Sequence, residues 1–118
     1  MVADLVSHQR QTLALFRQTG DQSGEAEALN GLGEALLGDG RPGDARTQHA
    51  TALRLASDIG HKYELARAHN GLGHAHGAVG EPVEARQHWQ QALARYTELG
   101  CPEADQVRAQ LTAMHDNT

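Results

Sequence analysis

Eight histidines are the side chains of this 118-residue sequence with the widest chemical repertoire, because imidazole binds metal ions and transfers protons near neutral pH. A helical metal pair needs two histidines three or four residues apart, so that both reach one ion. No two of the eight have this spacing, and there are no paired cysteines. The eight are His8, His49, His61, His69, His74, His76, His88 and His115. We therefore expect no metal site, and we interpret His49, His69 and His76 as packing residues.

The other reactive side chains do not form a catalytic pattern either. Cys101 is the single cysteine, and the sequence places no base or oxyanion site with it. Glu25, Glu27 and Glu34 recur at helical spacing, which is typical of a solvated helix face. No segment has the Gly-Lys-Ser/Thr ending of a phosphate-binding loop. The sequence therefore predicts no catalytic residues, no cofactor and a protein that is not an enzyme.

The composition indicates which classes of partner the protein can bind and in which cellular compartment it resides. A net charge of −5 and an aromatic content of 3% argue against nucleic-acid binding by this chain alone. No apolar run is long enough to span a membrane, and the amino terminus has no signal-peptide pattern. A lone cysteine cannot form an internal disulfide, which favours a reducing compartment. We expect a cytoplasmic protein, and the single lysine among ten basic residues is typical of a bacterium with a GC-rich genome.

A repeat of forty residues must position these side chains. Glycine occurs at every twentieth position from Gly20 to Gly100. Segment 21–60 aligns without gaps on segment 61–100, and the two are identical at 14 of 40 positions. The strings that recur include Asn-Gly-Leu-Gly, which begins at residues 30 and 70. Such self-similarity is the sequence signature of a stacked repeat protein.

Each half of the repeat reads as one amphipathic helix. Leu29, Leu32 and Leu36 recur at three and four residues, as an apolar helix face requires. The glycines stand where a helix ends, and a proline two residues after some of them fits the first turn of the next helix. The expected helices span residues 3–18, 23–38, 42–58, 63–78, 82–98 and 102–115. Because one hairpin cannot bury its own apolar face, successive hairpins must stack.

The helices carry a residue pattern that resembles the tetratricopeptide repeat (TPR) family. In that family the first helix of each repeat, helix A, has a large residue, then Leu-Gly, then another large residue. The second helix, helix B, has a small, a large and a small residue. In the first unit these are Leu29, Leu32-Gly33, Leu36, Ala45, His49 and Ala52. In the second they are His69, Leu72-Gly73, His76, Ala85, Trp89 and Ala92. The resemblance implies an all-α superhelix, a TPR solenoid of about six antiparallel helices, in two full repeats plus flanking half-repeats.

The phase of the repeat divides the chain as a single array over residues 1–118. Residues 1–20 are expected to be helix B of a truncated repeat, 21–60 and 61–100 the two repeats, and 101–118 a C-terminal capping helix. The long repeat is similar to the C-terminal TPR arrays of actinobacterial SARP-type transcriptional regulators that carry an NB-ARC module. This likeness implies the regulatory region of a transcriptional regulator, with the DNA-binding and ATPase parts outside this chain.

Helix A of each unit lines the concave groove in the TPR family, and side chains one residue from the buried pattern face the ligand. The resemblance therefore implies a protein or peptide partner, or another domain of the parent protein, bound by residues of two helices. These are Glu27, Asn30, Glu34 and Leu37, followed by Arg67, Asn70, His74 and Ala78. Asn30 and Asn70 occupy one repeat position, where an amide either contacts the backbone of a peptide or bonds between neighbouring helices A.

The amino-terminal helix suggests a second interpretation, a scaffold that self-associates through the ends of the array. An array that begins in the middle of a hairpin exposes the apolar stripe that a missing partner helix would bury. This stripe is expected to consist of Leu5, Leu13 and Phe16. A homodimer through this helix would cover it.

Overall fold

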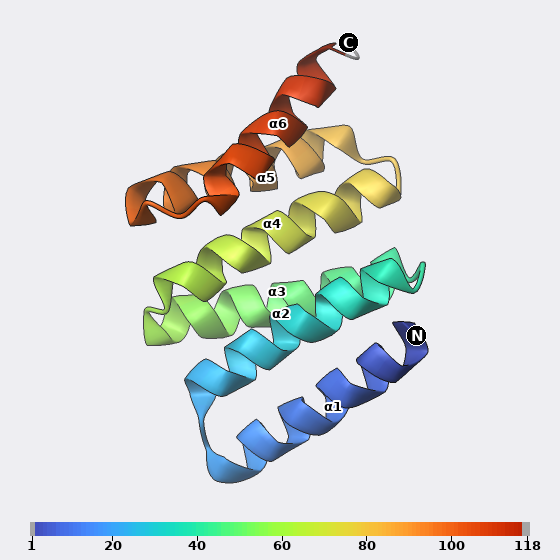
Figure 1. The fold of residues 1–118 in the computed structure, drawn as a ribbon, viewed down its shortest axis with the longest axis vertical. Helices are drawn as coiled ribbons and strands as arrows, with labels where there is room; N and C mark the ends of the chain where they lie inside the picture. The colour runs from blue at the N-terminus through green and yellow to red at the C-terminus, as the bar shows by residue number, and fades with distance from the viewer. Residues whose placement is uncertain (1, 117–118) are drawn as a thin grey trace.

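The structure, a computed structural model, describes residues 2–116 as six helices joined by short turns (Figure 1). They are α1 (Val2–Thr19), α2 (Gln22–Gly38), α3 (Pro42–Ile59), α4 (Lys62–Ala78), α5 (Pro82–Leu99) and α6 (Glu103–Asp116). Each helix begins and ends within one residue of the range expected from the sequence. The predicted all-α solenoid is confirmed for the described residues.

The helices end where the glycines permit a left-handed backbone. Gly60 follows α3 with φ 71°, and Gly100 follows α5 with the same value, a conformation that costs other residues a steric penalty. The Gly60 N–H donates to the carbonyl of Ser57, which satisfies part of the exposed helix end. Pro42 and Pro82 then start the next helix, where a missing N–H has no cost.

Small residues let the helices pack closely into a stack. The core consists mostly of alanine and leucine and includes fully buried Leu29, Leu36 and Ala52. Large side chains fill the spaces left by glycine: a methyl group on Gly33 or Gly71 would lie within 2.5 Å of the His49 ring. Glycine at these two positions is thus a packing requirement of the stack, although it lowers helix propensity.

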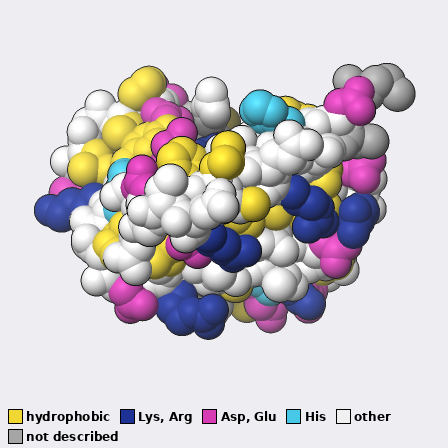
Figure 2. All heavy atoms as spheres, turned by 90° about the horizontal axis from the view of Figure 1, so that it is seen from below, with side chains coloured by type: hydrophobic (Ala, Val, Ile, Leu, Met, Phe, Trp, Pro, Cys, Tyr) yellow, Lys and Arg dark blue, Asp and Glu magenta, His cyan; other side chains and the backbone are white. Residues whose placement is uncertain are grey.

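The first helix exposes a different apolar surface from the one expected. Leu13 is buried, and Phe16 packs over Gly24 of α2, so neither is available to an outside partner. Of the expected stripe only Leu5 is exposed, at 48%, and Leu15 is exposed at 61%. The prediction was wrong for Leu13 and Phe16 because they face the core of the hairpin with α2. Figure 2 looks at the molecule from the α1 end and shows apolar side chains interspersed with charged ones on this face.

None of the helices within residues 2–116 combines the length and the apolar character needed to cross a lipid bilayer.

Candidate functional site

The expected partner-binding residues lie on α2 and α4, which are neighbouring helices A in the stack (Figure 1). The structure places them at two intervals: between α2 and α4, and between α4 and α6. The two intervals occupy equivalent places in the repeat, but their chemistry differs.

A buried polar network closes the interval between α2 and α4. Asn30 is fully buried, and its Nδ2 donates to both the backbone carbonyl and the carboxylate of Glu64, each at 3.0 Å. Its Oδ1 lies 2.8 Å from Nδ1 of His49. Because an amide oxygen only accepts, Nδ1 of His49 must carry the proton. Asn30 therefore joins three helices. Of its two expected roles, the structure shows the bond between neighbouring helices A, and the fully buried side chain presents no surface to a partner.

Burial keeps His49 neutral. Loss of solvent around the ring lowers the pKa of His49 from 6.5 to about 4, although the nearby Glu34 carboxylate opposes the shift. The interpretation of His49 as a packing residue is confirmed, since the side chain is fully buried and one ring nitrogen is hydrogen-bonded. His69 and His76 are only partly buried, and each has a ring nitrogen near a polar partner.

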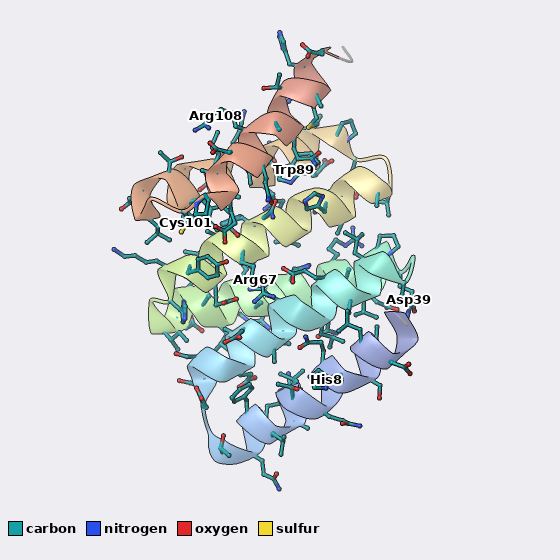
Figure 3. The ribbon with its side chains drawn as sticks, in the orientation of Figure 1. His8, Asp39, Arg67, Trp89, Cys101 and Arg108 are labelled. Carbon is teal, nitrogen blue, oxygen red and sulfur yellow. The ribbon has the colours of Figure 1, made fainter. Side chains whose placement is uncertain are left out.

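Ion pairs cover the solvent side of this network. Arg67 forms a bidentate pair with Glu34 at 2.7 and 2.8 Å, and a further contact of 3.2 Å joins it to Glu64. The hydrogen bonds that the Arg67 guanidinium donates to the Glu34 carboxylate raise the pKa of Arg67. Figure 3 shows Arg67 in the space between α2 and α4. Glu27 is exposed, and its backbone carbonyl accepts a 3.5 Å contact from Arg67.

The interval between α4 and α6 lacks such a network. Forty residues on from His49 and Glu64, which close the α2–α4 interval, the α4–α6 interval has Trp89 and Ala104. Among residues 2–116, the buried Oδ1 of Asn70 and Nε1 of Trp89 have no hydrogen-bond partner. Trp89 is labelled in Figure 3, close to α4 and α6. Asn70 therefore differs from Asn30: its oxygen is buried but not used.

Two cavities follow this interval, which we call the α4–α6 groove. One has a volume of about 600 Å³ and the other about 360 Å³. The larger is lined by Leu37, His74, Gly77, Ala78, Pro82, Ala85, Trp89 and Met114. The smaller is lined by Asn70, His74, Gln106, Val107, Ala109 and Gln110. His74 borders both cavities, so they adjoin.

The α4–α6 groove is closed at one end, where a hydrogen bond joins the two helices, and open at the other. Tyr63 at the start of α4 donates a hydrogen bond to Glu103 at the start of α6, and α6 turns away from α4 toward its C-terminal end (Figure 1). Asn70, His74 and Ala78 form a stripe at four-residue spacing on α4, opposite Gln106, Gln110 and Met114 on α6. Burial lowers the pKa of His74, whose ring stands edge-on to Trp89 at 5.2 Å.

Comparison with known proteins identifies the repeat. The sequence model of the family described as Tetratricopeptide repeat matches residues 24–98, which is more than half of the chain. The chain belongs to the tetratricopeptide repeat family. No curated protein matches the TPR chain by sequence.

A solved structure shows the same TPR-like fold. The crystal structure of a Rap protein complexed with Competence and Sporulation Factor superimposes with a TM-score of 0.90 at 20% sequence identity. The alignment covers 98% of this chain but 32% of the Rap chain, so this TPR array spans about a third of that protein's length.

The sequence missed the α6 side of the groove in this TPR array. Gln110 is forty residues after Asn70 and eighty after Asn30, so it holds the same repeat position. Met114 likewise follows Glu34 and His74. Treating 101–118 only as a capping helix hid this signal, and extending the repeat phase into it would have found both residues.

Proposed function

We propose that this TPR array is a non-enzymatic protein-interaction module that binds an extended segment of a partner in the α4–α6 groove. The observation that carries the proposal is the pair of buried, unpaired polar atoms at its wall, Asn70 Oδ1 and Trp89 Nε1, among the described residues. A buried polar atom without a partner costs free energy, and a ligand that supplies the missing hydrogen bond recovers it.

The chemistry of the groove fits a peptide backbone with an apolar side chain. A backbone N–H of the ligand donates to Asn70, and the exposed amides of Gln106 and Gln110 offer both donors and acceptors. The larger cavity is lined mainly by apolar side chains and takes an apolar group beside Met114, which adapts its shape to irregular ligands. We infer that the partner segment is extended, that its backbone forms hydrogen bonds with the side-chain amides of the groove, and that one large apolar residue anchors it.

The residues expected from the sequence divide into two roles in this proposal. Asn70 and His74 contact the bound segment directly. Glu27, Glu34 and Arg67 belong to the neighbouring α2–α4 interval, where the exposed carboxylates attract basic residues of the partner. Asn30 is left out because it is buried within the stack.

A selection from a displayed library of random peptides tests the groove. We expect Asn70→Ala and His74→Ala each to weaken the selected peptide by at least about tenfold. Gln90→Ala, on the exposed surface of α5, is the matched control and should leave the affinity unchanged. The proposal is wrong if the groove variants bind as tightly as the parent while all three melt at the parent's temperature.

We propose further that the array is the regulatory region of a bacterial, cytoplasmic transcriptional regulator of the SARP type with an NB-ARC module. The division into a leading helix B, two repeats and a final capping helix belongs to this proposal. The Rap neighbour is complexed with Competence and Sporulation Factor, which supports ligand binding by a fold of this kind. Under this proposal, the bound segment comes from a partner protein or from another domain of the parent. Neither nucleic acid nor a membrane is a partner of this chain alone.

Self-association through the ends of the array is the second candidate. Leu5 and Leu15 of α1 support it, because each is about half exposed or more. Sedimentation equilibrium over a range of concentrations separates the candidates. A monomer at every concentration that binds the selected peptide excludes self-association, and a dimer that is lost in a Leu5→Gln, Leu15→Gln double variant supports it.

A further inference from the structure

A cluster of side chains that can coordinate a metal lies at the turn between α4 and α5, and none of these side chains lines the α4–α6 groove. A ring nitrogen of His76 and one carboxylate oxygen each from Glu81 and Glu84 all lie within 4.8 Å of one another. Nδ1 of His76 is 2.9 Å from Oε1 of Glu81. Two ligands bound tetrahedrally to one zinc ion at about 2.1 Å lie about 3.4 Å apart, so small side-chain movements suffice to bring the three groups onto one ion.

The local fold holds these three side chains together before any ion binds. The N–H of Glu81 donates to the carbonyl of His76 at 3.0 Å, which fixes the turn that ends α4. Pro82 then starts α5, so that Glu81 is its N-cap and Glu84 lies in its first turn. His76 is five and eight residues before the two glutamates, a spacing that only this chain reversal brings together.

The first repeat shows that packing alone does not require these residues. The positions equivalent to His76, Glu81 and Glu84 are Leu36, Arg41 and Asp44. Leu36 is fully buried there, and Arg41 and Asp44 form an ion pair at 2.6 Å. The first repeat therefore forms the same turn without a histidine and without a pair of carboxylates at these positions.

We propose that His76, Glu81 and Glu84 form a binding site for a divalent transition-metal ion of the zinc class. One imidazole nitrogen and two carboxylates suit such an ion and balance its charge, whereas Mg²⁺ and Ca²⁺ prefer oxygen ligands alone. Glu81 and Glu84 are at least partly exposed, so water completes the coordination. On binding, Nδ1 of His76 gives up its hydrogen bond to Glu81, and the ring proton resides on Nε2.

A neighbouring arginine opposes the ion and provides a sharp test. Nη1 of Arg46, from α3, lies 3.6 Å from the same Oε1 of Glu81. Its positive charge competes with a metal ion for this carboxylate. Replacing Arg46 with glutamine should therefore tighten metal binding, which a purely structural role of the three ligands would not produce.

Two other groups carry atoms that can coordinate zinc and must be separated from this site: the His69–His88 pair beside it and Cys101 beyond the opposite end of α5. Nδ1 atoms of His69 and His88 lie 3.1 Å apart, and the His88 ring stacks on His76 at 5.4 Å. Cys101 is a free thiol. His69→Gln and Cys101→Ser therefore serve as controls that leave the three proposed ligands intact.

Calorimetric titration of the full chain with ZnCl₂, and separately with MgCl₂, tests the proposal. We expect one Zn²⁺ per chain and no Mg²⁺ binding. His76→Leu, which copies Leu36, and Glu84→Gln should each weaken Zn²⁺ by more than about tenfold, and Arg46→Gln should strengthen it. Melting in EDTA checks that every variant is folded, and Zn²⁺ should raise the melting temperature of the parent but not of His76→Leu.

The proposal is overturned if Zn²⁺ does not bind, if several weak ions bind per chain, or if His69→Gln or Cys101→Ser abolishes binding. Unchanged affinity in folded His76→Leu and Glu84→Gln would overturn it equally. None of these outcomes bears on the α4–α6 groove, because the inference does not rest on the proposed function.

Discussion

At the residue scale, one repeat position does two different things in this protein. Asn30 and Asn70 are forty residues apart in sequence, yet the first is fully bonded and the second has an unused oxygen. The difference comes from their neighbours, since His49 and Glu64 are replaced by Trp89 and Ala104. The sequence left both roles open for the pair, because the roles depend on contacts across helices rather than on the amide.

Substitution of the two asparagines should separate these roles. Asn30→Ala leaves the His49 N–H without a partner and removes one of the two hydrogen bonds to the buried Glu64 carboxylate, so we expect a loss of about 2–3 kcal/mol of unfolding free energy. Asn70→Ala should cost less than about 1 kcal/mol, because its oxygen has no partner to lose. Urea unfolding of both variants measures the difference, and equal losses would contradict the assignment.

His49 should make the stability depend on pH. Burial lowers its folded pKa to about 4 against 6.5 when unfolded, so the folded protein holds the neutral ring while the unfolded chain takes up a proton. The stabilisation is complete above about pH 6.5 and falls by up to about 3 kcal/mol as the pH drops to about 4. His69, also lowered to about 4 by burial and then by His88, adds to the loss.

The measurement is the free energy of unfolding of the parent and of His49→Gln at about pH 7.5 and about pH 4.5. Carboxylates that titrate in the same range act on both proteins, so the difference between the two slopes isolates His49. The variant should lose less stability on acidification than the parent. Equal slopes would show that His49 does not titrate in this way.

At the element scale, the sequence predicts the helices well, because helix boundaries are encoded locally. The apolar period, the glycines that end helices and the prolines that begin them fix all six described helices to within one residue. The exposed face of α1 was harder to predict. Whether Leu13 and Phe16 face solvent depends on how α1 sits on α2, which periodicity alone does not give.

Glycine-to-alanine substitutions should have opposite effects at different places in the helices. A methyl group on Gly71 would lie 2.3 Å from the His49 ring, so we expect Gly71→Ala to destabilise the protein by about 1–3 kcal/mol. Gly43, in the first turn of α3, has open space around it, and Gly43→Ala should stabilise by about 0.5–1 kcal/mol. Thermal melting of the pair checks both signs, and a stabilised Gly71→Ala would refute the close packing.

At the scale of the whole molecule, the two similar repeats leave different spaces between neighbouring helices A. The α2–α4 interval is sealed by the ion pairs of Arg67, whereas the α4–α6 interval opens into adjoining cavities. The sequence predicted the superhelix and the α4 stripe of Asn70 and His74. It missed the α6 side, since the opening arises from the divergence of the last helix, a property of the assembled array.

Backbone-amide NMR of the labelled protein, titrated with a peptide selected from the displayed library, tests the central claim most directly. We expect the largest shift changes at Asn70, His74, Gln106 and Gln110, together with the indole N–H of Trp89. Changes confined to the exposed face of α1 or to the sealed α2–α4 interval would contradict a binding site in the α4–α6 groove, as would a library that yields no binding peptide.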